Sequence, residues 1–428
     1  MSTESLSAST APPGAGAATG TPAANPAVTS PETSHGRKYL SVAQGVALIY
    51  GTNIGAGILS LPYAARNGGF LALVVALLIA GTLTTVSMLY IAEVSLRTKK
   101  PLQLSGLAEK YLGQWGRWLI FVAIVINSIG ALIAYAAGSG SLISNLTGLP
   151  PIVGTLVFFA LGTFVMWKGL HAAGFVEALI TIGMAMIIVT LCAWTILGPG
   201  ISAENLIVFH PFFIVPIMNL AVFTFLAQYV VPEIARGVDP ASPKAVPRSI
   251  VIGMVATGVT LAAVPFAALG LLGTSVSEVV TLSWGDALGP IAYYLANAFA
   301  LLAMFTSFIA IGFTAMRNVL DIRHWPETGW QRAAAVGLTV IPPLLISMAG
   351  LGGFVAALSY AGGFAGAIMS VIPVLLLHAA RKNGDKQPVW KATWQAHPVL
   401  QVLLIAVYAL AFAYSLLAIF GLVPAGWA

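Results

Sequence analysis

The residues with the clearest capacity for chemistry lie in one stretch, 51–62, which reads Gly-Thr-Asn-Ile-Gly-Ala-Gly-Ile-Leu-Ser-Leu-Pro. Three glycines within seven residues, with Thr52 and Asn53 beside them, weaken a helix inside an apolar segment. A helix broken there presents free N–H groups where its second half begins, and these can hold a carboxylate. It also presents free carbonyl groups where its first half ends, suited to an ammonium group or a cation. One break could therefore bind both charges of a zwitterion.

Small residues at this spacing have a second interpretation. They allow two membrane helices to approach closely, as Gly-x-x-x-Gly patterns do. Spacing alone does not choose between close helix packing and a binding site.

The composition places this stretch in a membrane protein. Of the 428 residues, 58% are hydrophobic and only 7% are charged, whereas a soluble chain carries about 25% charged residues. Crossing the hydrocarbon core takes about 20 apolar residues. The sequence predicts eleven such helices, near 41–64, 70–96, 118–141, 150–167, 173–197, 212–233, 250–272, 287–316, 333–350, 353–378 and 398–420. Glycines at 350, 352 and 353 leave room only for a tight turn between the ninth and tenth.

The basic residues support this count. On the predicted map, 18 of the 19 Lys and Arg residues fall on one face and only Arg66 falls on the other. The positive-inside rule then predicts a cytoplasmic N-terminus and, with eleven helices, a C-terminus outside. The formal charge of +6 therefore reflects membrane topology and does not indicate a nucleic-acid partner. The Ala-, Pro-, Ser- and Thr-rich residues 1–36 are predicted to form a disordered cytoplasmic tail ahead of a transmembrane domain over 37–428.

The first-helix stretch, continuing to Tyr63 and Ala64, resembles the motif of the amino acid/polyamine/cation superfamily. More narrowly it is similar to the bacterial tryptophan/tyrosine permease family, within the amino-acid/auxin permease group. Residues 107–113, 341–344 and 358–363 resemble further stretches of that family, which also has eleven spans. The residues 223–232 are similar to the family's sixth-span pattern, although they lack Gly, and relatives often have His where Gln228 stands.

The resemblance implies an all-α LeuT-type fold, with two five-helix inverted repeats plus one extra helix and breaks in the first and sixth spans. It also implies that part of the first span holds the substrate backbone and that the sixth span shapes its side-chain pocket. The residues concerned are Thr52, Gly55, Ala56 and Gly57 in the first span and Phe223, Thr224 and Phe225 in the sixth. Asn53 belongs to the same candidate site by position.

Other polar residues lie inside the predicted spans. By fold analogy Asn127 of the third span flanks the site, and Thr306 and Ser307 of the eighth could join carbonyl groups near Gly51 in a sodium site. Hydrogen bonding between helices would explain these residues equally well.

Three carboxylates fall within or at the ends of predicted spans, where an ionisable group suggests function. Glu93 has Arg97 four residues later and Glu233 has Arg236 three later, so both are predicted to form interfacial ion pairs. Glu177 has no basic neighbour on its helix. It is therefore either a proton-coupling residue or a hydrated residue near the cytoplasmic face.

These observations predict a permease of the cytoplasmic (inner) membrane that imports an aromatic or neutral amino acid by proton symport and alternating access. The open alternatives are a sodium-coupled symporter of small neutral amino acids and an amino acid sensor without transport. An enzyme is not expected, because the six His are dispersed and no metal-ligand or nucleophile pattern occurs. No cofactor is expected beyond a proton or sodium ion. The expected partners are the amino acid and the lipid bilayer, and the oligomeric state is left open.

Overall fold

The computed structural model describes residues 39–168, 174–239, 242, 244–323 and 325–427. The predicted tail over 1–36 lies outside these residues. The first half of the chain contains α1 (Val42–Asn53), α2 (Gly57–Ala65), α3 (Phe70–Arg97), α4 (Leu104–Leu112), α5 (Gln114–Thr147), α6 (Pro151–Lys168) and α7 (Gly174–Leu197).

The second half continues in the same way. It contains α8 (Ala203–Leu206), η1 (Pro211–Phe213), α9 (Ile214–Thr224), η2 (Gln228–Val230), α10 (Val231–Gly237), α11 (Ala245–Leu272), α12 (Val280–Leu288), α13 (Pro290–Arg323), α14 (Gly329–Met348), α15 (Phe354–Ala361), the π-helical η3 (Gly362–Gly366), α16 (Ala367–Asn383), η4 (Trp394–Ala396) and α17 (Pro398–Ile419).

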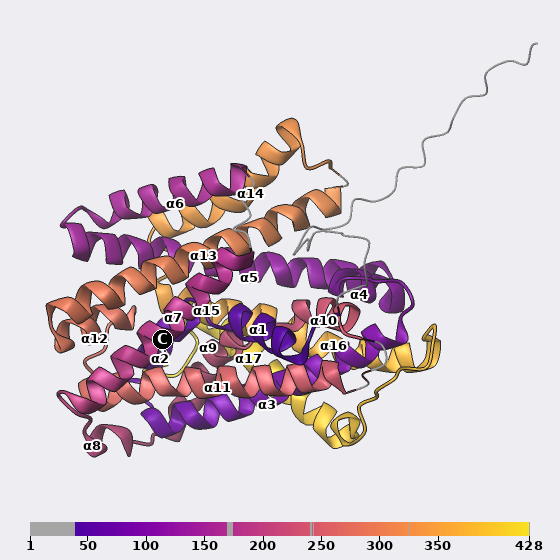
Figure 1. Ribbon diagram of the computed structural model, residues 1–428, viewed down its shortest axis with the longest axis horizontal. Helices are drawn as coiled ribbons and strands as arrows, with labels where there is room; N and C mark the ends of the chain where they lie inside the picture. The colour runs from indigo at the N-terminus through magenta and orange to yellow at the C-terminus, as the bar shows by residue number, and fades with distance from the viewer. Residues whose placement is uncertain (1–38, 169–173, 240–241, 243, 324, 428) are drawn as a thin grey trace, which may run out of the picture. The chain divides into compact units, whose positions relative to one another are not determined.

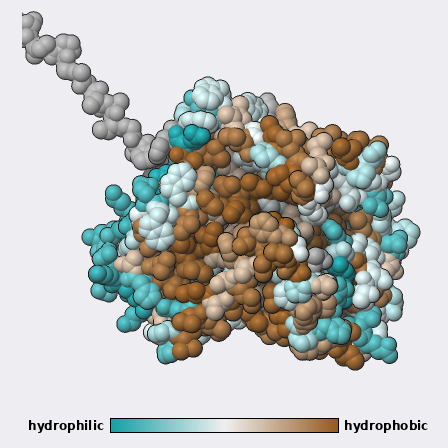
Figure 2. Space-filling model, turned by 180° about the vertical axis from the view of Figure 1, so that it is seen from behind, coloured by the Kyte–Doolittle hydropathy of each residue, from teal (hydrophilic) through white to brown (hydrophobic). Residues whose placement is uncertain are grey.

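The long helices agree with the predicted spans. In the described part of the chain, eight helices are long and apolar enough to cross a membrane, and the bent pair α1–α2 makes a ninth. Shorter apolar helices over Pro151–Trp167 and Ile182–Leu197 correspond to the remaining two predicted segments. Figure 2 shows hydrophobic side chains over the middle of one face, with hydrophilic residues gathered towards its opposite ends. The fold is thus an all-α membrane protein.

The turn between the ninth and tenth predicted spans is as tight as expected. α14 ends at Met348 and α15 begins at Phe354. Gly350 and Gly352 adopt φ values of +71° and +129°, a conformation that side-chain-bearing residues rarely adopt. Glycine is therefore required at these two positions.

Burial separates central from peripheral helices. About 72% of the most apolar window of Pro211–Gly237 is buried inside the protein, against 28% for Gly329–Met348 and for Pro398–Ile419. α2 packs against α9, and α1 packs along α11. In the view of Figure 1, α1 and α2 lie between the long helices α13 and α11. The two spans predicted to be broken therefore lie among the core helices.

The beginning of the first span is fixed by its own sequence and by the sixth span. Ser41 caps α1 by accepting a hydrogen bond from the Gln44 N–H, and the Gln44 side chain returns a bond to the Ser41 N–H. Just before this cap, the Leu40 N–H donates to the Gly237 carbonyl at 2.7 Å. This bond ties the start of α1 to the end of α10.

Candidate substrate and ion site

The first span is broken where the glycine-rich stretch predicts. α1 ends at Asn53 and α2 begins at Gly57, with a bend of 57° between them. The Ile54 N–H still bonds the Tyr50 carbonyl. Among the described residues, the carbonyls of 51–53 accept no further backbone bond and the N–H groups of 55–57 donate none. Both kinds of free backbone group thus occur at one break.

The eighth span brings a hydroxyl to this break. A Cβ built on Gly55 would lie 2.9 Å from the Ser307 Oγ of α13. The neighbouring Thr306 hydroxyl bonds the Leu302 and Ala303 carbonyls of its own helix, both at 3.1 Å. Ser307, rather than Thr306, therefore faces the break.

The sixth span contributes two of its predicted residues. A Cβ on Gly57 would lie 2.5 Å from the Thr224 Cγ2 and 3.4 Å from the Phe223 Cδ1. The Thr224 hydroxyl donates to the Ala221 carbonyl at 2.7 Å, so its methyl group packs towards the first span. Phe223 and Thr224 thus lie directly against the start of α2.

The sixth span is itself broken next to these residues. α9 ends at Thr224, and regular α-helix resumes only with α10 at Val231, after the short η2 turn. Phe225 lies in this break, but its ring points the other way: the Cζ is 2.9 Å from a Cβ built on Gly81 of α3. Of the three predicted sixth-span residues, the structure brings Phe223 and Thr224 to the first break and places the Phe225 ring elsewhere.

Two tyrosines that were not predicted from the sequence, Tyr135 and Tyr229, join this group. Tyr135 of α5 is 1% exposed, and its hydroxyl interacts with Ser307 and lies near Tyr229 of η2. A buried Tyr hydroxyl needs a polar partner. A tyrosine inside a predicted apolar span, such as Tyr135, therefore marks a place where polar groups meet. Tyr135 follows Asn127 by eight residues, just over two turns of the same helix.

The remaining predicted polar residues are more dispersed. Thr52 bonds the Leu48 carbonyl of its own helix at 2.7 Å, and nothing lies within 4 Å of a Cβ built on Gly51. The Asn53 Nδ2 lies 3.5 Å from the Thr257 Oγ1 of α11. The side-chain oxygens of Asn53 and Asn127 are buried with no hydrogen-bond partner in the described part of the chain. Ala56 is buried in the break itself.

The three carboxylates have different outcomes. The Glu93–Arg97 ion pair is confirmed at 2.8 Å. The expected pair between Glu233 and Arg236 was wrong: among the described residues Glu233 instead accepts a hydrogen bond from Gln103 at 3.1 Å. The prediction considered only neighbours on the same helix, whereas the partner of Glu233 is Gln103, the residue directly before α4. The Glu177 side chain lies outside the described residues.

Glu93 has a second partner that is distant in the sequence. Its fully buried carboxylate accepts two bonds from Arg381 of α16, at 2.9 and 2.8 Å, and one from the Ala392 N–H at 2.8 Å. The single negative charge of Glu93 is thus shared by two arginines and a backbone N–H, and these bonds fix α3, α16 and the segment before η4 to one another.

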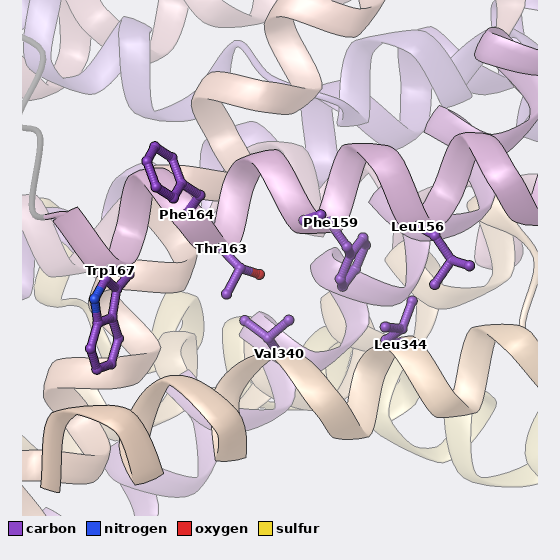
Figure 3. A pocket seen from close by; sticks show the side chains of 8 residues that line it. Leu156, Phe159, Thr163, Phe164, Trp167, Val340 and Leu344 are labelled. Carbon is purple, nitrogen blue, oxygen red and sulfur yellow. The ribbon is translucent and has the colours of Figure 1, made fainter. Parts of the chain in front are cut away.

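A separate furrow of about 490 Å³ runs between α6 and α14 (Figure 3). Its walls are apolar apart from Thr163, and they include Phe159, Phe164, Trp167 and Val340. No charged group lines it, so it offers nothing to the carboxylate or ammonium of an amino acid. Among the described residues, no group of three or more His, Cys, Asp or Glu side chains could hold a metal ion.

The chain resembles known transport proteins over most of its length. It is 27% identical over 366 residues to the tyrosine-specific transport system 1 of Haemophilus influenzae, covering 80% of this chain and 90% of that protein. It is 26% identical over 409 residues to a tryptophan-specific transport protein of Pseudomonas aeruginosa, covering 88% and 94%. Relatives named as transport proteins place the chain among transporters rather than enzymes.

Solved structures share the fold at low sequence identity. MhsT, solved in complex with L-phenylalanine, superposes with a TM-score of 0.62 at 16% identity, covering 90% of this chain and 100% of that one. The manganese transporter of Eremococcus coleocola superposes with a TM-score of 0.57 at 14% identity, covering 90% and 89%. Both are LeuT-fold transporters, which confirms the fold class expected from the first-helix motif.

The model of the tryptophan/tyrosine permease family matches residues 38–413, which include both helix breaks and every side chain that meets at them. The chain therefore belongs to the tryptophan/tyrosine permease family.

Proposed function

We propose that this protein imports an aromatic amino acid, tyrosine or tryptophan, by proton-coupled alternating access. The observation that carries the proposal is the first break, where the free N–H groups of 55–57 and the free carbonyls of 51–53 occur together and Ser307 faces Gly55. The positive end of α2 suits the substrate carboxylate and the negative end of α1 suits its ammonium group. The relatives' named substrates, tyrosine and tryptophan, guide the choice of side chain.

The aromatic side chain would lie towards the sixth span. Phe223 is the ring nearest Gly57, and the Tyr135 and Tyr229 hydroxyls lie on the Ser307 side. An aromatic ring prefers an edge-to-face or offset partner, which Phe223 can supply. The hydroxyl of a bound tyrosine or the indole N–H of a bound tryptophan needs a hydrogen-bond partner, which a tyrosine can supply.

Alternating access would use the two breaks as hinges. The bond between the Leu40 N–H and the Gly237 carbonyl joins the start of α1 to the end of α10, the ends that lie away from the two breaks. These half-helices would therefore move together, while α2 and α9 keep their contact at Gly57 and Thr224.

A sodium-coupled mechanism is the second candidate, favoured by one observation. Within the described part of the chain, the Asn53 Oδ1 is buried without a hydrogen-bond partner, and it follows carbonyls that the break leaves free. Amide and carbonyl oxygens suit a hard cation. In this alternative Asn53 holds the coupling ion, whereas in the proton mechanism Glu177 carries the proton.

The test is uptake of labelled amino acids into proteoliposomes under an inward proton gradient without sodium, or an inward sodium gradient at equal pH. The proposal expects accumulation of tyrosine or tryptophan, but not of serine, under the proton gradient. Loss of that accumulation in Glu177→Gln but not in Asn53→Ala supports proton coupling. The reverse pattern under sodium supports the alternative, and no accumulation under either gradient refutes symport.

We also propose that the chain lies in the bacterial inner membrane with its N-terminus in the cytoplasm and its C-terminus outside. The support is the clustering of 18 of the 19 basic residues on one predicted face. With Cys192 replaced by Ser, a cysteine at exposed Lys382 should be protected from an impermeant thiol reagent in intact cells. A cysteine at exposed Asn145 should react. The opposite labelling pattern would show that the chain has the inverted orientation.

A further inference from the structure

A second pocket, of about 300 Å³, lies at the N-terminal end of α11. None of its lining residues belongs to either helix break. Its walls come from α3, from the first turns of α11 and from the segment that precedes α17. The lining residues are Leu89, Lys244, Pro247, Arg248, Val251, Ile252, Trp390 and Gln395.

Of the described residues that line the pocket, two are positively charged and none is negatively charged. Lys244 and Arg248 are exposed, stand four residues apart and so share one face of the helix. Neither forms an ion pair within the described residues, although Arg97, Lys110 and Arg381 each pair with a carboxylate. The N-terminus of α11 adds its positive end to the same place. The site therefore attracts an anion.

An apolar stripe continues from the pocket along α11. Val251, Ile252, Val255 and Val259 are 43%, 50%, 61% and 65% exposed, and they follow Arg248 at helical spacing. From Arg248 to Val259 the helix rises about 16 Å. This is about half the thickness of the hydrocarbon core, that is, the depth of one leaflet.

The opposite wall of the pocket is held in place from inside the protein. The Ala392 N–H donates to the buried Glu93 at 2.8 Å, and the Ala392 carbonyl accepts from Arg381 at 2.6 Å. These bonds fix the backbone two residues after Trp390. The Trp390 side chain lines the pocket together with Lys244 and Arg248, and Trp residues are enriched at the membrane–water interface.

From this arrangement we propose that the pocket binds an anionic phospholipid. Its phosphate lies between Lys244 and Arg248, its glycerol region meets Trp390, and one acyl chain follows the Val251–Val259 stripe. Free phosphate would use the two cations but not the apolar wall, so the stripe favours a lipid. The proposal does not depend on which amino acid is carried.

The test uses the purified full-length protein in detergent, titrated with phosphatidylglycerol or with phosphatidylcholine of identical acyl chains and measured by native mass spectrometry. Each cation near an anionic headgroup contributes about fivefold in affinity, so Lys244→Gln combined with Arg248→Gln should weaken phosphatidylglycerol binding about thirtyfold. The matched control is Lys100→Gln combined with Lys382→Gln, which removes two exposed charges elsewhere. It should change binding less than threefold.

A second readout locates the lipid. Brominated phosphatidylglycerol should quench part of the tryptophan fluorescence, and this part should be absent in Trp390→Phe. The proposal is overturned by equal binding of the two lipids, by equal losses in the test and control variants, or by full displacement of phosphatidylglycerol by millimolar inorganic phosphate. Quenching that is unchanged in Trp390→Phe would also overturn it.

Discussion

Replacing Gly57 by Ala perturbs the proposed site at the point where α2 meets α9. The added Cβ would lie 2.5 Å from the Thr224 Cγ2, and ordinary contacts begin at 3.4 Å, so the groups must separate by about 0.9 Å. Overpacking of this kind costs about 1–3 kcal/mol. Because each 1.4 kcal/mol is a factor of ten, tyrosine uptake at low substrate concentration should fall between about fivefold and 150-fold.

A second substitution should restore uptake. Thr224→Ser removes the Cγ2 but keeps the hydroxyl that bonds the Ala221 carbonyl, leaving the Cβ of residue 224 at 3.4 Å. The combined variant should return to within about threefold of the unsubstituted protein. Gly183→Ala is the matched control, since Gly183 lies in α7 outside both breaks and nothing lies within 4 Å of its new Cβ.

The assay is the initial rate of labelled tyrosine uptake into proteoliposomes, normalised to folded protein by thermal midpoint and size-exclusion profile. Two results would refute the reasoning. One is unchanged uptake in Gly57→Ala. The other is a combined variant no better than Gly57→Ala alone, which would mean that the defect does not arise from the Thr224 contact.

Three further substitutions test other parts of the account. Glu93→Gln should lower the thermal midpoint strongly, because breaking a buried ion pair costs about 3–5 kcal/mol, whereas exposed Glu204→Gln should not; equal midpoints would contradict this. The Lys110 ammonium beside Asp385 holds the pKa of that carboxyl below its usual range. Asp385 therefore stabilises the fold above pH about 4 and loses this effect as the pH falls through its lowered pKa, so the thermal-midpoint gap to Asp385→Asn should close on acidification; a gap independent of pH would refute it. Glu177→Gln should make uptake insensitive to the proton gradient, and an unchanged pH profile would exclude Glu177 as the coupling group.

The number of spans and the first break were predictable because they depend on local sequence. Long apolar runs and clustered basic residues define the helices, and the glycines of 51–57 mark the break. The second break carries no such mark. Phe225 and Ala227 adopt φ values of −108° and −116°, which residues other than glycine reach freely.

Contacts between distant segments were not predictable. Arg381 and Glu93 are 288 residues apart in the sequence, and nothing on either helix specifies the other as its partner. Tyr135 likewise joins the candidate site only because α5 packs against α13. The sequence indicated which residues of the first span could bind, whereas the fold determined which side chains face them.

The most direct test of the central claim asks whether the site binds the carboxylate and the ammonium group of the same amino acid. Tyramine, which lacks the carboxylate, and 3-(4-hydroxyphenyl)propionate, which lacks the ammonium group, should compete with labelled tyrosine at the purified protein. A hydrogen bond to a charged group contributes about 1.5–3 kcal/mol, so each analogue should bind at least about tenfold more weakly than tyrosine. If either analogue binds as tightly as tyrosine, the first break does not hold both ends of the substrate.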